Sequence, residues 1–234
     1  MTPVPVSGPD ECPGARPRVV CIDDDTPIRE AVQHLLPGVD VVAVHPRVET
    51  YLADPVPVDV VLLDLLLLET GEAGLQGARG VAAVAATGSK VLIYTNERRR
   101  EVLAGCFAAG AHGIAHKSDT MSATEQAVRA VAAGRLVLTT ALAGLAELLA
   151  RRGELRPLSP RKVEVLRGRA RGESYKSIGA RLFIAPATAE EYMSEVSRTF
   201  AGFLGAHSAA DLERHLGIGP GDLLDPLRPR SVPS

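Results

Sequence analysis

The chain has 234 residues, of which 46% are hydrophobic and 23% charged, with a formal net charge of −2. This composition excludes collagen-like, fully disordered and disulfide-scaffold proteins. The three cysteines are scattered without metal-ligand spacing, which indicates a reducing compartment and predicts a cytoplasmic protein. No apolar run reaches the roughly 18 residues of a membrane span, so no membrane association is expected.

Short apolar runs and helical patterns alternate after a Pro- and Gly-rich lead-in, residues 1–17, that we expect to be flexible. The expected strands are Val19–Ile22, Val41–Val44, Val58–Leu63, Val91–Tyr94 and Gly113–Ala115. The expected helices are Pro27–Leu36, Val48–Ala53, Ala78–Ala86, Glu97–Ala109 and Ser122–Ala133. Strands made of Val, Ile and Leu are buried on both faces. The pattern therefore predicts an α/β fold with a doubly wound five-stranded parallel sheet over residues 18–135.

The second part of the chain reads as a linker followed by a small all-α domain. Residues 136–156 form the linker, with a partly helical pattern, and residues 157–217 form the domain, with a flexible tail over 218–234. Its predicted helices are Pro160–Arg171, Tyr175–Leu182 and Pro186–Phe200, and Ser159 before Pro160 is a good start signal for the first.

Charge is distributed unevenly between these two parts. Residues 1–150 carry 12 Lys and Arg against 18 Asp and Glu, a net charge of −6. Residues 151–234 carry 14 against 10, a net charge of +4. The asymmetry indicates two domains with different partners, the second of which has the charge to bind a polyanion.

Polar side chains follow the predicted strands at the edge where doubly wound sheets bind ligands. Asp23 and Asp24 follow the first strand, Asp64 the third, Thr95 the fourth and Lys117 the fifth. Two carboxylates about 4 Å apart repel by about 4 kcal/mol at an effective dielectric constant near 20, so the cluster favours a cation. Magnesium prefers such oxygen ligands. An aspartate in this setting can attack phosphorus and carry the phosphoryl group. A solvated surface position is the simpler explanation for any one of these residues, but the whole set, each at the end of a different strand, favours a functional site.

Four segments carry a resemblance to the receiver domain of two-component response regulators, over about residues 18–135. They are VVCIDDD from Val19, VDVVLLD from Val58, IYTN from Ile93 and GAHGIAHKS from Gly110. The resemblance implies that Asp64 accepts phosphate from a partner histidine kinase. It also implies that Lys117 contacts the phosphoryl group and that Thr95 moves toward it. The implied Mg²⁺ ligands are Asp24, Asp64 and the backbone carbonyl of Leu66, with Asp23 helping through water.

Three positions depart from the receiver pattern. The segment LLLLETGEAG after Asp64 lacks the Met-Pro that the family often has. Ile114 stands where a switch Tyr or Phe is common, so the usual coupling of a hydroxyl to a ring cannot operate. Ser118 replaces a frequent proline after the lysine. None of these removes an acceptor or a metal ligand, so phosphorylation stays chemically possible.

The segment from Leu158 to Phe200 resembles the LuxR-type helix-turn-helix of the same regulator class. The resemblance implies that the helix Pro186–Phe200 enters the major groove of double-stranded DNA. Helical spacing places Ala189, Met193, Val196 and Phe200 in the core. The expected outer face carries Glu190, Glu191, Ser194, Ser197 and Arg198.

The candidate DNA contacts have an unusual charge. They are Lys176, Arg181, Thr188, Glu190, Glu191, Ser194 and Arg198. Glu190 and Tyr192 stand where the family usually offers Lys and His, and carboxylates repel phosphates. A carboxylate can nevertheless accept from the amino group of cytosine. Thr188 with Glu191 fits a helix-capping box equally well, and the arginines at 167, 169 and 171 fit a solvated helix face.

The two resemblances together imply a transcriptional response regulator that binds DNA as a homodimer when Asp64 is phosphorylated. The alternative is a phosphorylation-independent regulator whose receiver serves for dimerisation or docking, which the loop and Ile114 departures favour. A phosphotransfer or phosphatase enzyme would need a substrate pocket that nothing in the sequence indicates, so no enzymatic activity is expected.

Overall fold

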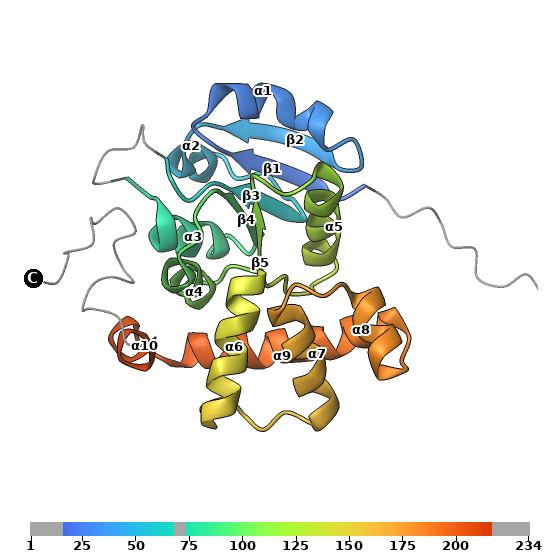
Figure 1. The fold of residues 1–234 in the computed structure, drawn as a ribbon. Coiled ribbons are helices and arrows are strands. Elements are labelled where there is room, and N and C mark those ends of the chain that lie inside the picture. Colours follow the sequence, from blue (N-terminus) through green and yellow to red (C-terminus); the bar gives the residue numbers. More distant parts are fainter. Residues whose placement is uncertain (1–15, 68–73, 217–234) are drawn as a thin grey trace, which may run out of the picture.

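The computed structural model describes residues 16–67 and 74–216 and has an α/β part followed by a set of C-terminal helices (Figure 1). The predicted flexible ends, 1–17 and 218–234, lie outside the described residues except for residues 16 and 17. The strands are β1 (Arg18–Ile22), β2 (Asp40–His45), β3 (Val60–Leu63), β4 (Lys90–Thr95) and β5 (Gly113–His116). The helices of this part are α1 (Thr26–Leu35), α2 (Val48–Ala53), α3 (Gly77–Ala85), α4 (Arg100–Ala108) and α5 (Met121–Ala132).

The sheet has the order β2-β1-β3-β4-β5, and every neighbouring pair is parallel. Alternate residues of each strand face opposite layers of helices. Val20 and Ile22 of β1 join the apolar cluster under α2, α3 and α4, whereas Val19 and Cys21 join the cluster under α1 and α5. The doubly wound five-stranded parallel sheet is therefore confirmed.

The chain that leaves α5 returns to the exposed edge of β5. Val137 forms a parallel bridge with Gly113, the amide of Ile114 donates to the carbonyl of Val137 (3.1 Å), and the amide of Val137 donates to the carbonyl of His112 (3.0 Å). A Cβ at Gly113 would lie 3.0 Å from the Cβ of Val137, so only glycine allows this approach without a shift. These bonds attach the connecting segment directly to β5.

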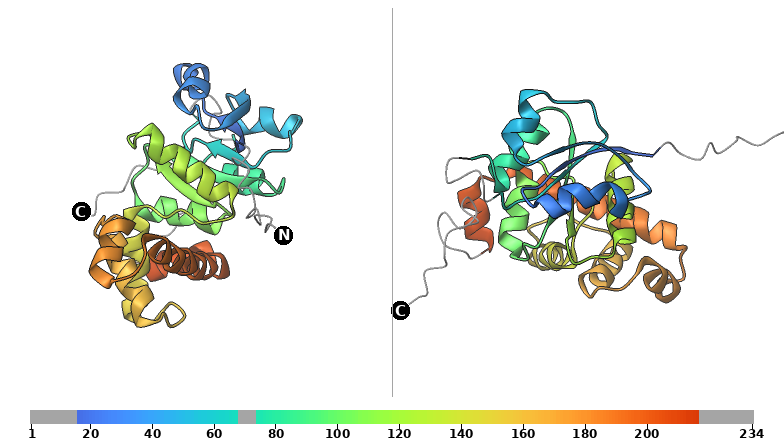
Figure 2. Two further views of the ribbon diagram at one scale, coloured as in Figure 1. Left: turned by 90° about the vertical axis from the view of Figure 1, so that its right-hand side faces the viewer. Right: turned by 90° about the horizontal axis from the view of Figure 1, so that it is seen from above.

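The C-terminal helices are α6 (Thr140–Arg152), α7 (Pro160–Ala170), α8 (Tyr175–Leu182), α9 (Pro186–Ala206) and α10 (Ala209–Leu216). They form a separate layer along one side of the α/β part (Figure 2). Helices α6 and α9 both contact α4, and Phe107 of α4 shares a buried apolar cluster with Phe200 and Leu204 of α9. Within the described ranges, no helix is both long and apolar enough to cross a membrane.

Some predicted element boundaries are wrong for identifiable reasons. Helix α4 begins at Arg100 instead of Glu97, because the Glu97 carboxylate accepts hydrogen bonds from the amides of Arg98 (2.8 Å) and Arg99 (2.7 Å) and holds these residues in a turn. Helix α9 continues six residues beyond Phe200, to Ala206. Helix α10 was not expected; the Ser208 hydroxyl accepts from the amide of Asp211 (3.2 Å) at its start.

Candidate functional site

Three aspartates converge at the carboxyl ends of β1 and β3. The two strands are neighbours in parallel register, with Ile22 beside Leu63, so the residues that follow them meet at one edge. Oxygen atoms from Asp23, Asp24 and Asp64, one from each carboxylate, lie within 4.8 Å of one another. The structure thus brings together the three carboxylates that the sequence placed at this edge.

Lys117, which follows β5, reaches into the same cluster. Its Nζ lies 2.8 Å from Oδ2 of Asp23 and 2.8 Å from Oδ2 of Asp64. Its backbone amide donates to the carbonyl of Thr95 at 3.0 Å, which fixes the backbone position from which the side chain extends. Burial alone would lower the pKa of the Lys117 ammonium, but its contacts with the two carboxylates outweigh burial and raise the pKa above its usual value. Lys117 is therefore a fixed positive charge.

Asp23 is the most deeply placed carboxylate, with 1% of its surface exposed. Its Oδ1 accepts from the amide of Asp25 (3.0 Å), and its Oδ2 lies 2.8 Å from the Lys117 ammonium, with no other partner among the described residues. Burial raises the pKa of Asp23, and the Lys117 ammonium and the Asp25 amide offset only part of this effect.

The charge balance of the cluster fits a divalent cation. Three carboxylates and one ammonium leave a net charge of −2, and among the described residues the buried Oδ2 of Asp23 has only the Lys117 ammonium as a partner. Carboxylate oxygens are the ligands that hard divalent cations prefer. Asp24 is partly exposed, which leaves the cluster open to solvent on one side.

The other predicted residues of this site take distinct positions. Thr95 is fully buried at the end of β4, and its hydroxyl accepts from the amide of Glu97 (3.2 Å). The amide of Leu66 donates to Oδ1 of Asp64 at 3.4 Å, so the chain after β3 folds back toward the carboxylate. Ile114 is buried in β5 among the apolar side chains on the α4 side of the sheet.

Helices α8 and α9 form the predicted helix-turn-helix pair. The hydroxyl of Ser174 caps α8 by accepting from the amide of Ser177 at 3.1 Å. The four residues expected to face the core of α9 are all buried: Ala189, Met193, Val196 and Phe200. The expected core positions of α9 are therefore confirmed.

The predicted DNA contacts divide into exposed and engaged side chains. Lys176, Glu191 and Arg198 are exposed, and Thr188 and Ser194 are partly buried. Arg181 is also exposed, but its guanidinium pairs with Glu173 (3.0 Å) and Glu164 (3.5 Å) on the same set of helices.

Two expectations about α9 are wrong. Ser197 is 1% exposed instead of lying on the outer face, because the side of α9 that carries it faces the α/β part. The Thr188–Glu191 capping box does not form at the start of α9, since the N-cap residue is Ala185 and no side chain caps the helix. Thr188 lies inside the first turn.

Glu190 makes a contact that the sequence does not reveal. Its Oε1 lies 2.6 Å from Nη1 of Arg135, which belongs to the segment after α5, and both side chains are about two-fifths exposed. Glu190 and Ser194 also line a cavity together with Ala127 and Ala130 of α5. The major groove is about 12 Å wide and admits a helix only if the reading face is free. In this arrangement part of the predicted reading face of α9 is turned toward the α/β part.

The basic cluster near α7 is engaged within the C-terminal helices. Arg167 pairs with Glu164 (2.7 Å) and Glu147 (3.6 Å). The guanidinium of Arg169 lies 4.8 Å from the ring centroid of Tyr175. Both arginines thus have partners within the C-terminal helices, which agrees with a structural role on the helix surface.

Known proteins are similar to this chain over both the α/β part and the C-terminal helices. Residues 156–215 match the family of bacterial regulatory proteins of the luxR type. A Mycobacterium tuberculosis protein described as a probable transcriptional regulatory protein NarL is 30% identical over 184 residues, covering 76% of this chain and 85% of the relative. Among solved structures, the Salmonella typhimurium RcsB response regulator aligns over 87% of this chain and 99% of its own, with a TM-score of 0.50 and 19% identity. That last similarity concerns the fold.

Proposed function

The chain belongs to the DNA-binding response regulators of the LuxR family, and we propose that phosphorylation of Asp64 by a partner histidine kinase controls its binding to DNA. The observation that supports this proposal is the convergence of three carboxylates on one ammonium at the edge of the sheet. In the proposal, residues 18–135 are the receiver domain, and residues 157–217 the DNA-binding domain.

Asp64 is positioned to act as the nucleophile. An ionised oxygen of its carboxylate attacks the phosphorus of a phosphohistidine, the O–P bond forms as the N–P bond breaks, and the departing imidazole takes up a proton. The product is an acyl phosphate on Asp64. Lys117, 2.8 Å from Oδ2 of Asp64, supplies positive charge to the phosphoryl oxygens without any rearrangement of the strand that carries it.

A magnesium ion fits the same cluster. Asp23, Asp24 and Asp64 would hold it together with the carbonyl of Leu66, and it would neutralise charge on the phosphoryl group. Only Asp64 changes its covalent state in this step.

The response to phosphate has a direct route to the C-terminal helices. Thr95 must give up the hydrogen bond from the Glu97 amide before its hydroxyl can turn to the phosphoryl group, which changes the turn before α4. Lys117 follows β5, and the amide of Ile114 in that strand binds the carbonyl of Val137. A shift of β5 therefore moves the connecting segment without a switch aromatic ring at position 114.

Release of α9 from the receiver would complete the switch. Once free, a homodimer would place two copies of α9 in successive major grooves of double-stranded DNA. Lys176, Arg181 and Arg198 would then anchor phosphates. Thr188, Ser194, Glu190 and Glu191 would face base edges, where a carboxylate can accept from cytosine.

A phosphorylation-independent regulator is the second candidate. The observation that favours it is Ile114, whose burial on the α4 side of the sheet leaves no aromatic ring to follow the movement of Thr95. In that case the receiver would serve for dimerisation or docking only.

Labelling with a small acyl phosphate separates the two candidates. The wild-type chain, incubated with acetyl phosphate and Mg²⁺, should give a phosphorylated species on a phosphate-affinity gel, and Asp64→Asn should give none. Asp40→Asn is the matched control, because Asp40 is exposed at the start of β2 and outside the carboxylate cluster. Equal labelling of the wild type and Asp64→Asn would refute the proposal. An affinity for DNA that is the same with and without phosphorylation would favour the second candidate.

A further inference from the structure

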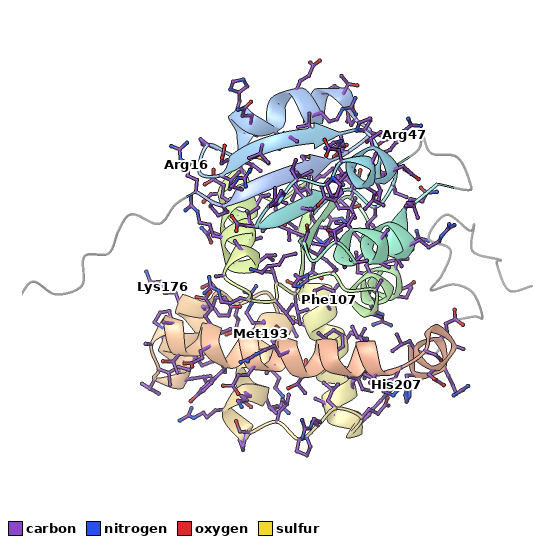
Figure 3. The ribbon with its side chains drawn as sticks, turned by 180° about the vertical axis from the view of Figure 1, so that it is seen from behind. Arg16, Arg47, Phe107, Lys176, Met193 and His207 are labelled. Atoms are coloured by element: carbon purple, nitrogen blue, oxygen red, sulfur yellow. The ribbon has the colours of Figure 1, made fainter. Side chains whose placement is uncertain are left out.

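A cavity of about 230 Å³ lies where the receiver meets the DNA-binding domain; we name it the α5–α9 cavity. Its apolar wall includes Ala127 and Ala130 of α5, Leu136 and Val137 of the connecting segment, and Met193 of α9. Met193 is labelled on α9 in Figure 3, on the side of the helix toward the receiver. A closed cavity of about 150 Å³ can hold benzene. The space is therefore sufficient for one six-membered ring with a short substituent.

The charged lining of the cavity favours an anion. Arg135, Arg169 and Glu190 contribute two positive charges and one negative charge, a net charge of +1. The ion pair with Glu190 uses Nη1 of Arg135, and Arg169 donates through Nη1 to the carbonyl of Glu173. A guanidinium carries five N–H donors and matches a carboxylate in two-point contacts. One carboxylate in the cavity would balance the charge.

Ser197 adds an independent indication of a ligand. Its side chain lines the cavity and is 1% exposed, and among the described residues its buried hydroxyl has no hydrogen-bond partner. Leaving a buried polar group unpaired is destabilising. The hydroxyl oxygen is covered in this rotamer, so a turn of the Ser197 side chain toward the cavity would let a ligand oxygen accept from it.

We propose that the α5–α9 cavity binds a small aromatic carboxylate, which bridges the receiver and α9 and holds the two together. The ring packs on the apolar wall, and the carboxylate interacts with the arginines and the Ser197 hydroxyl. Because α5 and the connecting segment form one wall and α9 another, the cavity exists only while the two domains are in contact. A ligand that binds only this arrangement stabilises it and lowers the apparent affinity for DNA. The site does not depend on Asp64 or on its phosphorylation.

Methionine-methyl NMR of the full chain gives a local measurement. The chain has three methionines, Met1, Met121 and Met193, and Met193 lines the cavity whereas Met121 does not. With ¹³C-methyl methionine and benzoate as the probe, we expect a saturable shift of the Met193 signal. Met193→Leu assigns that signal. Neutral benzamide, which has a similar shape, should bind at least threefold more weakly.

Two substitutions test the location without removing a charge. Ala130→Leu fills the cavity from α5 and should abolish the benzoate-dependent shift of Met193. Ser197→Ala should weaken binding while leaving the apolar wall intact. Asp64→Asn should bind benzoate like the wild type, which separates this proposal from phosphorylation.

The functional consequence is measured by DNA binding. At benzoate concentrations ten times its Kd, the apparent Kd of the wild type for DNA should rise by up to about 11-fold, with no change for Ala130→Leu. Three results would each overturn the inference: no saturable shift at Met193, the same shift in Ala130→Leu, or equal binding of benzamide and benzoate.

Discussion

The Arg135–Glu190 ion pair predicts a measurable brake on DNA binding. The substitution Arg135→Gln removes the pair while leaving the reading face of α9 unchanged. Both side chains are about two-fifths exposed, so the 2.6 Å contact belongs with surface pairs, which contribute about 0.2–1 kcal/mol. This free energy favours the closed arrangement, in which α9 contacts the receiver. Losing it should raise the DNA affinity of the unphosphorylated chain by about 1.4- to 5-fold.

Fluorescence anisotropy with a labelled, mixed-sequence duplex measures this change. Arg214→Gln is the matched control, because Arg214 pairs with Asp211 inside α10. A double-mutant cycle with Glu190→Gln isolates the pair, since Glu190→Gln also removes a negative charge near DNA. An Arg135→Gln chain whose affinity is unchanged or lower, with no coupling to Glu190→Gln, would refute the reasoning.

Three further predictions concern the receiver. Lys117→Met removes the ammonium that pairs with Asp23 and Asp64, and it should lower the free energy of unfolding, measured in urea without metal, by about 3–5 kcal/mol. A loss below about 1 kcal/mol would contradict this. Mg²⁺ at ten times its Kd should stabilise the wild type by about 1.4 kcal/mol, and Asp24→Asn should reduce this gain at the same concentration. Burial, together with the charge of Lys90, lowers the pKa of His112 in the folded chain, so the unfolded chain binds more protons and stability falls as pH drops below about 6.5. His112→Asn should therefore remove up to about 1 kcal/mol of the stability lost between pH 7.5 and pH 5.5. An unchanged pH dependence of the free energy of unfolding would count against this.

The sheet and its carboxylate cluster were predictable because they depend on short-range patterns. Continuous Val, Ile and Leu runs identify buried parallel strands, and in such a sheet the residues after each strand meet at one edge. Asp23 and Asp64 therefore fall together once β1 and β3 are recognised as neighbours. What the sequence could not provide is the position of Lys117 Nζ between them, which depends on the turn after β5.

The contact between the two domains was not predictable in the same way. Arg135 and Glu190 are 55 positions apart, and no periodic pattern relates them. The burial of Ser197 has a different origin: Ser197 follows the buried Met193 by four positions and precedes the buried Phe200 by three, so helical spacing places it beside the core stripe. The start of α10 could have been found, because Ser208 stands three residues before Asp211 in a capping pattern.

The magnitudes also limit what holds α9 in place. A closed-to-open ratio of 99:1 corresponds to about 2.7 kcal/mol, half of the roughly 5.5 kcal/mol that inverts it, whereas the Arg135–Glu190 pair contributes at most about 1 kcal/mol. Most of the closing free energy must therefore come from apolar contact, and Phe107 of α4 packs in one buried cluster with Phe200 and Leu204 of α9. A carboxylate at position 190 adds to this bias twice, by pairing with Arg135 and by repelling phosphates once α9 is free. It follows that Arg135→Gln should raise basal DNA binding but leave most of the phosphorylation response intact, whereas Phe107→Ala should weaken the closed arrangement far more.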